Sequence, residues 1–184
     1  MKLKFLTLIA FYLLLNYSTK AQQNTTDVRK PDIVNFGFGI GFDYGGIGGN
    51  FMVYPQKNIG IFIAGGYAFA GMGYNAGIKL RLSPSKSTVV NPYITAMYGY
   101  NASVSVSDNP QYDKLFYGPS LGLGIDIRSR KPDSKGYLSI ALMIPIRNSD
   151  AQNYIDLLKN EYGATFSTNL PPIGFSIGYK FIVH

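Results

Sequence analysis

The chain has few side chains suited to chemistry, and their positions exclude most kinds of it. Its single histidine, His184, is the last residue, and there is no cysteine. A Ser-His-Asp arrangement needs a histidine within hydrogen-bond reach of the nucleophile and a third group that orients it. Zinc sites use Cys or His ligands, so only carboxylates remain to hold a metal. The sequence therefore predicts no enzyme, no cofactor and no metal site.

Two other motifs have ordinary structural explanations. Asp108, Asn109 and Asp113 share one predicted loop and could touch Ca²⁺, but their spacing matches no known ligand loop. The glycine-rich segment 37–49 would bind a dinucleotide only if a helix began within it. Its apolar residues recur with a period of two instead. We interpret the first motif as solvated loop acids and the second as β-strand.

Residues 1–21 have the pattern of a secretory signal peptide. Lys2 and Lys4 precede the apolar run 5–15, and the polar stretch after it ends at Ala21. Cleavage after Ala21 leaves 163 residues (184 − 21) with a net charge of +4, from (17 − 3) − 10. No basic stripe is visible in that remainder, so the sequence predicts no nucleic-acid binding.

The rest of the chain alternates with a period of two, as expected of strands with one apolar face. No long helical pattern occurs before residue 149. We predict an all-β fold with eight strands, an even number that suits an antiparallel up-and-down barrel. The predicted strands are 33–44, 47–54, 59–69, 72–82, 92–106, 117–128, 138–146 and 173–183.

The two strand faces indicate which solvent each one meets. A soluble sandwich or lipocalin-like barrel would carry Lys, Glu, Thr and Arg opposite its apolar face. Here those positions are mostly Gly, Ser, Ala and Asn, which suit the cramped interior of a narrow closed barrel. A transmembrane barrel reverses the faces, with apolar residues toward lipid and tyrosines near the strand ends. It also accounts for a charged content of only 15%.

With this pattern the region after the signal peptide resembles a small eight-stranded outer-membrane barrel of the OmpA/OmpX type. Its glycine and aromatic content is similar to the outer-membrane β-barrel families of Bacteroidota. Residues 178–184 resemble the closing strand that the barrel-assembly machinery reads, although they end on His184 rather than Phe. The resemblance implies export to the outer membrane of a Gram-negative bacterium. It also implies contacts with outer-membrane lipid and lipopolysaccharide, and a monomeric barrel.

The resemblance also implies a topology in which both termini lie in the periplasm. Residues 22–32 are then a short periplasmic segment and residues 33–184 form the barrel. The connections 55–58, 83–91 and 129–135 become periplasmic turns. Seven charged residues are predicted to point into the lumen, as a polar plug of salt bridges or as the lining of a narrow pore: Lys79, Arg81, Asp126, Arg128 and Lys180 near the periplasmic end, and Asp43 and Arg147 near the outer end.

The last outer loop carries the one helical pattern. Asp150 is a plausible N-cap and Gly163 a plausible C-terminal stop for a short helix over 151–162. One face of that helix is apolar, so the helix packs over the barrel mouth or lies in the membrane interface, or else it binds a partner or a ligand. The residues of this face are Tyr154, Ile155, Leu158 and Tyr162.

We expect an integral outer-membrane barrel with a non-enzymatic role in envelope structure or surface interaction. One alternative is a narrow, porin-like pore for small polar solutes or ions. The other is a secreted, soluble, lipocalin-like binder of an apolar ligand.

Overall fold

The computed structural model describes residues 32–83, 89–106, 110–130, 134–147, 149–162 and 170–183. The expected signal peptide, 1–21, and most of the expected periplasmic segment, 22–31, lie outside the described residues. So do Asp108, Asn109, Gly163 and His184.

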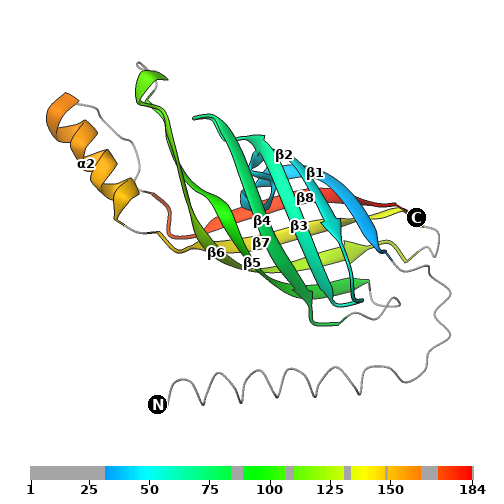
Figure 1. Ribbon diagram of the computed structural model, residues 1–184. Coiled ribbons are helices and arrows are strands. Elements are labelled where there is room, and N and C mark those ends of the chain that lie inside the picture. Colours follow the sequence, from blue (N-terminus) through cyan, green and yellow to red (C-terminus); the bar gives the residue numbers. More distant parts are fainter. Residues whose placement is uncertain are drawn as a thin grey trace, which may run out of the picture.

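Eight antiparallel strands close into one barrel, which confirms the predicted fold (Figure 1). Each strand pairs with its neighbours in sequence, and β8 pairs with β1 from Val34↔Val183 to Gly41↔Ser176. Closure gives every strand a partner strand on both sides. The strands are β1 Val34–Gly41, β2 Gly46–Val53, β3 Ile59–Tyr67, β4 Met72–Arg81, β5 Val90–Val104, β6 Lys114–Arg128, β7 Gly136–Pro145 and β8 Gly174–Val183.

The strand ends differ from the prediction by up to three residues, and three of these differences have a clear cause. β1 stops at Gly41 because Phe42–Tyr44 form a 3₁₀ turn, η1. β3 stops at Tyr67 because a tight turn follows, in which Phe69 has a φ of 58°. β6 begins at Lys114 because its first residues pair with the end of β5, beyond a bulge between Tyr100 and Ala102. The β5–β6 hairpin therefore rises past the rest of the rim (Figure 1).

The strand faces divide by residue type. Large apolar side chains point outward and are exposed on all eight strands. Inward positions carry buried polar, charged and aromatic side chains, together with glycines. Representative outward residues are Phe38, Ile63, Ile78, Ile94, Leu123, Leu142 and Phe175, and representative inward ones are Asn35, Asn50, Lys79, Tyr93, Asp126, Ser139 and Lys180.

The predicted helix is present as α2, Asp150–Tyr162, between β7 and β8. The backbone N–H of Asn153 donates to the carbonyl of Ser149 at 2.8 Å. That bond makes Ser149 the N-cap, one residue before the predicted Asp150. Among the helices of the described ranges, none is both long and apolar enough to cross a membrane.

The apolar face of α2 packs on the raised part of the β5–β6 hairpin. Ile155 and Leu158 are only 2% and 1% exposed, and they form a small core with Val104. The Tyr154 hydroxyl donates to the carbonyl of Tyr112, in the short 3₁₀ helix η2 (Pro110–Tyr112), at 2.9 Å. Of the predicted interaction face, Ile155 and Leu158 are therefore covered by the chain itself, and Tyr162 is the last residue of the helix.

This packing predicts that α2 can be released without unfolding the barrel. Leu158→Ala should cost about 2–5 kcal/mol of local stability, because it removes a fully buried side chain from the small core. Limited proteolysis should then cut within 149–162 while the strands stay protected. Leu157→Ala, at an exposed neighbouring position, is the matched control and should leave cleavage unchanged. Equal cleavage of both variants would contradict this packing.

Candidate functional site

A charged cluster fills the lumen near the end where β1 begins and β8 ends. It comprises Asp32, Lys79, Arg81, Asp126 and Arg128. Lys79 and Arg81 occupy alternate positions at the end of β4, and Asp126 and Arg128 do so at the end of β6. Alternate strand residues share a face, so all four point inward.

The ion pairs of this cluster span the lumen. Asp126 accepts from Lys79 Nζ at 2.7 Å and lies 3.5 Å from Arg81 Nε. Arg81 also reaches Asp32 Oδ2 at 2.8 Å, and Arg128 forms an ion pair with the same carboxylate. Every member is almost fully buried, and buried charges are tolerated only when they are paired and hydrogen-bonded.

Polar and aromatic side chains complete the surroundings of these charges. Lys79 Nζ lies 3.5 Å from the ring centroid of Tyr93, and the Arg81 guanidinium carbon lies 3.8 Å from that of Tyr54. The Ser139 hydroxyl donates to Asp126 at 2.9 Å, and Arg81 donates to the Tyr137 hydroxyl at 3.1 Å. Cation–π contacts and hydrogen bonds offset part of the cost of removing the charges from water.

Asp32 is the member that the sequence analysis missed, because it lies before the first strand. Its side chain bridges Arg81 and Arg128 and closes the cluster at the barrel end. Burial alone would raise the pKa of the Asp32 carboxyl, but the two guanidinium groups hold it below its ordinary value. This contribution to stability is therefore present at neutral pH and is lost only as the pH falls through that lowered pKa.

The structure separates the other three predicted lumen charges from this cluster. Lys180 is fully buried, and its ammonium donates to Asn50 Oδ1 at 3.1 Å. Asp43 is buried within η1. Arg147 is only partly buried and lies at the rim, where it donates to the carbonyls of Asn101 at 3.1 Å and Pro171 at 2.6 Å. Arg147 thus holds the rim together rather than lining the lumen.

The turn η1 folds into the outer half of the lumen. Tyr44 is completely buried there. The Asn50 amide donates to the Asp43 carbonyl at 2.8 Å, and the Asp43 N–H donates to Ser176 Oγ at 3.1 Å. The Asn75 amide also donates to the Phe42 carbonyl. Side chains from β2, β8 and β4 therefore hold the turn inside the barrel.

Inward-facing glycines make room for this turn. A Cβ on Gly39 would lie 2.6 Å from the Tyr44 ring, and one on Gly178 would lie 2.4 Å from it. A Cβ on Gly174 would lie 2.0 Å from the ring of Phe42. The inward-facing glycines of β1 and β8 thus form a cradle that accommodates the side chains of η1. This role is more specific than the general lack of space that the sequence suggested.

This cradle predicts a large difference between two glycine-to-alanine changes. Gly178→Ala should destabilise the barrel by about 1–3 kcal/mol, because the new methyl group overpacks the Tyr44 ring and nearby backbone. Gly65→Ala is the matched control, since its Cβ would meet one atom at 3.9 Å. Unfolding in urea, followed by the gel shift of unboiled samples, measures both. Equal midpoints for the two variants would show that η1 is not packed against the glycines.

Apolar side chains fill the space between the charged cluster and η1. Met52, Phe62, Met97 and Met143 form one buried cluster with Tyr54, Tyr93 and Ala141. An eight-stranded barrel is just wide enough for side chains to fill, and here they do. The described part of the lumen is therefore closed by three layers in series: the charged cluster, the apolar cluster and η1.

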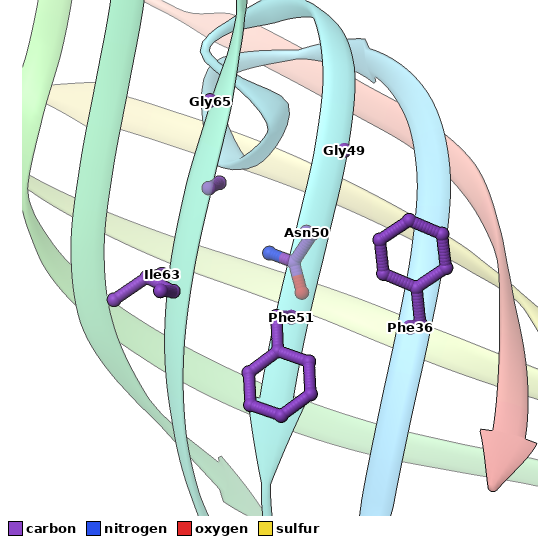
Figure 2. A pocket seen from close by; sticks show the side chains of 7 residues that line it. Phe36, Gly49, Asn50, Phe51, Ile63 and Gly65 are labelled. Carbon is purple, nitrogen blue, oxygen red and sulfur yellow. The ribbon is translucent and has the colours of Figure 1, made fainter.

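A depression lies on the outward face of the barrel and is shown in Figure 2. Phe36, Phe51 and Ile63 form its apolar walls, and the opposed glycines Gly49 and Gly65 leave the space between them. Its volume is about 380 Å³. It lies on the apolar outer surface of β1, β2 and β3, on the opposite side of the sheet from the charged lumen. Within the described residues, no three His, Asp or Glu side chains are grouped as metal ligands.

The fold and its filled interior define the class of this protein as a closed, eight-stranded, antiparallel up-and-down β-barrel. No protein-family model matches the sequence, and no curated protein matches it. Among solved structures, the chain is similar to the N-terminal β-barrel domain of OprF from Pseudomonas aeruginosa. The two share 9% sequence identity with a TM-score of 0.42, over 80% of this chain and 96% of that one. A likeness this distant says nothing about function, so the class rests on the strand pairing itself.

Proposed function

We propose that this protein is an integral outer-membrane β-barrel with a non-enzymatic role in envelope structure or surface interaction. The observation that carries the proposal is the outward face of the closed barrel. Leu123 is 64% exposed and Ile63 is 61% exposed, and large apolar residues occupy most outward positions around the barrel. A monomeric soluble protein rarely exposes a contiguous apolar surface of that extent. Lipid is the solvent that such a face matches.

The inward face argues against a soluble, lipocalin-like binder. Such a barrel would place apolar residues inside, around its ligand, and polar residues outside. Here Asp126 and Lys79 are buried in the lumen, and the exposed face is the apolar one. The filled lumen likewise favours a sealed barrel over a porin-like pore, because buried ion pairs and a buried apolar cluster occupy it within the described residues.

The signal-peptide pattern of residues 1–21 and the resemblance to OmpA/OmpX-type and Bacteroidota barrels support export to the outer membrane. In the orientation we propose, the barrel end with Val34 and Val183 faces the periplasm. Then α2 and the raised β5–β6 hairpin face outward, where longer connections normally lie. The partners would be outer-membrane lipid, lipopolysaccharide and, during biogenesis, the barrel-assembly machinery.

Membrane fractionation with a gel of boiled and unboiled samples tests the proposal. We expect the protein in the detergent-soluble membrane fraction, with an SDS-resistant band that shifts only after heating. Recovery from the aqueous periplasmic fraction without detergent would contradict the membrane assignment. Reproducible single-channel steps in a planar bilayer would instead overturn the sealed-barrel role and favour the pore.

A further inference from the structure

The inward position of η1 depends on neutral contacts, namely the packing of the Tyr44 and Phe42 rings and a few hydrogen bonds. Three hydrogen bonds hold the turn, from the amides of Asn50 and Asn75 and to the hydroxyl of Ser176. The net contribution of each such bond is modest, because the same groups bond to water when they are released. No ion pair between η1 and the barrel wall is present among the described residues.

Other groups make the inward position less favourable. Two polar groups of the turn itself, Asp43 Oδ1 and the Tyr44 hydroxyl, are buried without a hydrogen-bond partner among the described residues. Leaving a buried polar group unsatisfied costs more free energy than an ordinary hydrogen bond returns. Both groups would regain partners in water if the turn moved out of the lumen. They therefore reduce the free-energy difference that the packing of the two rings creates between the inward and outward positions.

Glycines lie at both ends of the turn, where the backbone would have to rotate. Gly41 has a φ of 123°, and Gly45 and Gly46 have φ values of 69° and 107°. Positive φ is open to glycine at little cost, and so are the negative values of an ordinary hairpin loop. Glycine at these three positions therefore tolerates the backbone angles of both positions of η1. Hinges in proteins consist of a few residues that absorb such changes in backbone angle.

The floor beneath η1 carries an unmatched positive charge. Lys180 Nζ lies 5.6 Å from the ring centroid of Tyr44 and bonds only to the neutral Asn50 within hydrogen-bond reach. No carboxylate of the described residues forms an ion pair with it within 4.0 Å. An outward movement of η1 would remove the Asp43 carboxylate and leave the Lys180 ammonium facing the mouth of the barrel.

From these observations we infer that η1 is a hinged plug, and that its outward movement opens an anion-accepting cup with Lys180 at its floor. In the inward state the plug, which carries the Asp43 carboxylate, covers Lys180, and the Tyr44 ring centroid lies 5.6 Å from the ammonium. Asn50, which bonds to both Lys180 and the Asp43 carbonyl, links the floor to the plug. The apolar and charged layers below keep the cup closed at its far end, so the device exposes a binding site rather than a channel.

The absence of cysteine allows a direct test by thiol labelling of the folded, membrane-embedded protein. Ser176→Cys places a thiol under the plug, and Ser120→Cys is the matched control. Both serines are 1% exposed and face the lumen, but Ser120 lies on β6, which provides none of the three bonds to η1. The probes are an anionic methanethiosulfonate (sulfonatoethyl) and a cationic one (trimethylammonioethyl), with rates normalised to free cysteine. A gel of unboiled samples confirms that each variant is folded.

We expect slow labelling at residue 176 and none at residue 120 on the same timescale. Asn75→Ala should raise the rate at 176 about fivefold, since it removes one bond to the plug, and should leave 120 unchanged. The anionic probe should react faster than the cationic one, and Lys180→Met should abolish that preference. Labelling at equal rates in both positions, no acceleration by Asn75→Ala, or a preference for the cationic probe would each overturn the proposal. If Asn75→Ala does not fold, Tyr44→Phe, which removes a hydroxyl that has no partner in the inward state, should slow labelling at residue 176, and an unchanged or faster rate would overturn the proposal.

Discussion

Replacing Asp126 with asparagine should destabilise the folded barrel by about 3–5 kcal/mol. The carboxylate is completely buried and contacts the ammonium of Lys79 at 2.7 Å and the guanidinium of Arg81 at 3.5 Å. Asparagine is nearly isosteric but carries no charge, so both cations would stay buried with less compensation. Losing one member of a buried ion pair costs far more than the pair contributes net, because the remaining charge cannot return to water. Equilibrium unfolding in lipid vesicles or detergent measures the loss.

Asp156→Asn is the matched control, because Asp156 lies on the exposed face of α2 and accepts a hydrogen bond from Gln152. It should change the free energy of unfolding by no more than about 0.5 kcal/mol. Similar stabilities for the two variants would mean that water reaches the charged cluster. That result would favour a water-filled pore over a sealed lumen.

The second large effect concerns the outward face. Leu123→Arg should destabilise the membrane-inserted barrel by about 2–4 kcal/mol, because Leu123 lies at the middle of β6 and would place a charge near the bilayer midplane. On a soluble barrel, the same exposed substitution would be nearly neutral. Folding into vesicles, followed by the heat-dependent gel shift, measures the difference.

Leu157→Arg provides the corresponding control outside the barrel. Leu157 is an exposed leucine on α2, so an arginine there should leave folding into vesicles unchanged. An equally small effect at residue 123 would contradict lipid contact on the outward face, whatever the shape of the barrel.

Alternation predicted most of the fold, and it failed where the chain leaves its strands. It placed Lys79, Arg81, Asp126 and Arg128 correctly in the lumen because all four lie within regular strands. Arg147 has the inward parity of β7, but β7 ends at Pro145 and the chain then bends over the rim. Odd and even positions alternate between the two faces only within a strand. Beyond the end of β7, the residue number therefore no longer indicates whether a side chain points into the lumen.

Asp32 shows the opposite failure. Asp32 has an even number, like the outward residues Phe36 and Phe38, so alternation would point its side chain outward. Its carboxylate nevertheless reaches the lumen, because Asp32 precedes the first strand. The available signal for this contact was that Asp32 is a lone acid next to a barrel end with several cations. Local patterns do not contain that information, since Asp32 and Arg128 are 96 residues apart.

The inward fold of η1 could not be predicted, although its cause is visible in the sequence. The sequence pattern explains Gly39 and Gly178 only by the narrowness of the lumen. In the structure, these two glycines make room for the ring of Tyr44. Which part of the chain occupies a lumen depends on the three-dimensional fit between wall and turn. The pattern of small residues shows only that something large must lie opposite them.

Fluorescence quenching by lipid is the most direct test of the central claim that the outward face contacts hydrocarbon. The chain contains no tryptophan, so each introduced tryptophan reports on one position. We expect strong quenching of Leu123→Trp in vesicles of lipids brominated along their acyl chains, and none of Leu157→Trp on α2. Weak and equal quenching at both positions would contradict the membrane assignment.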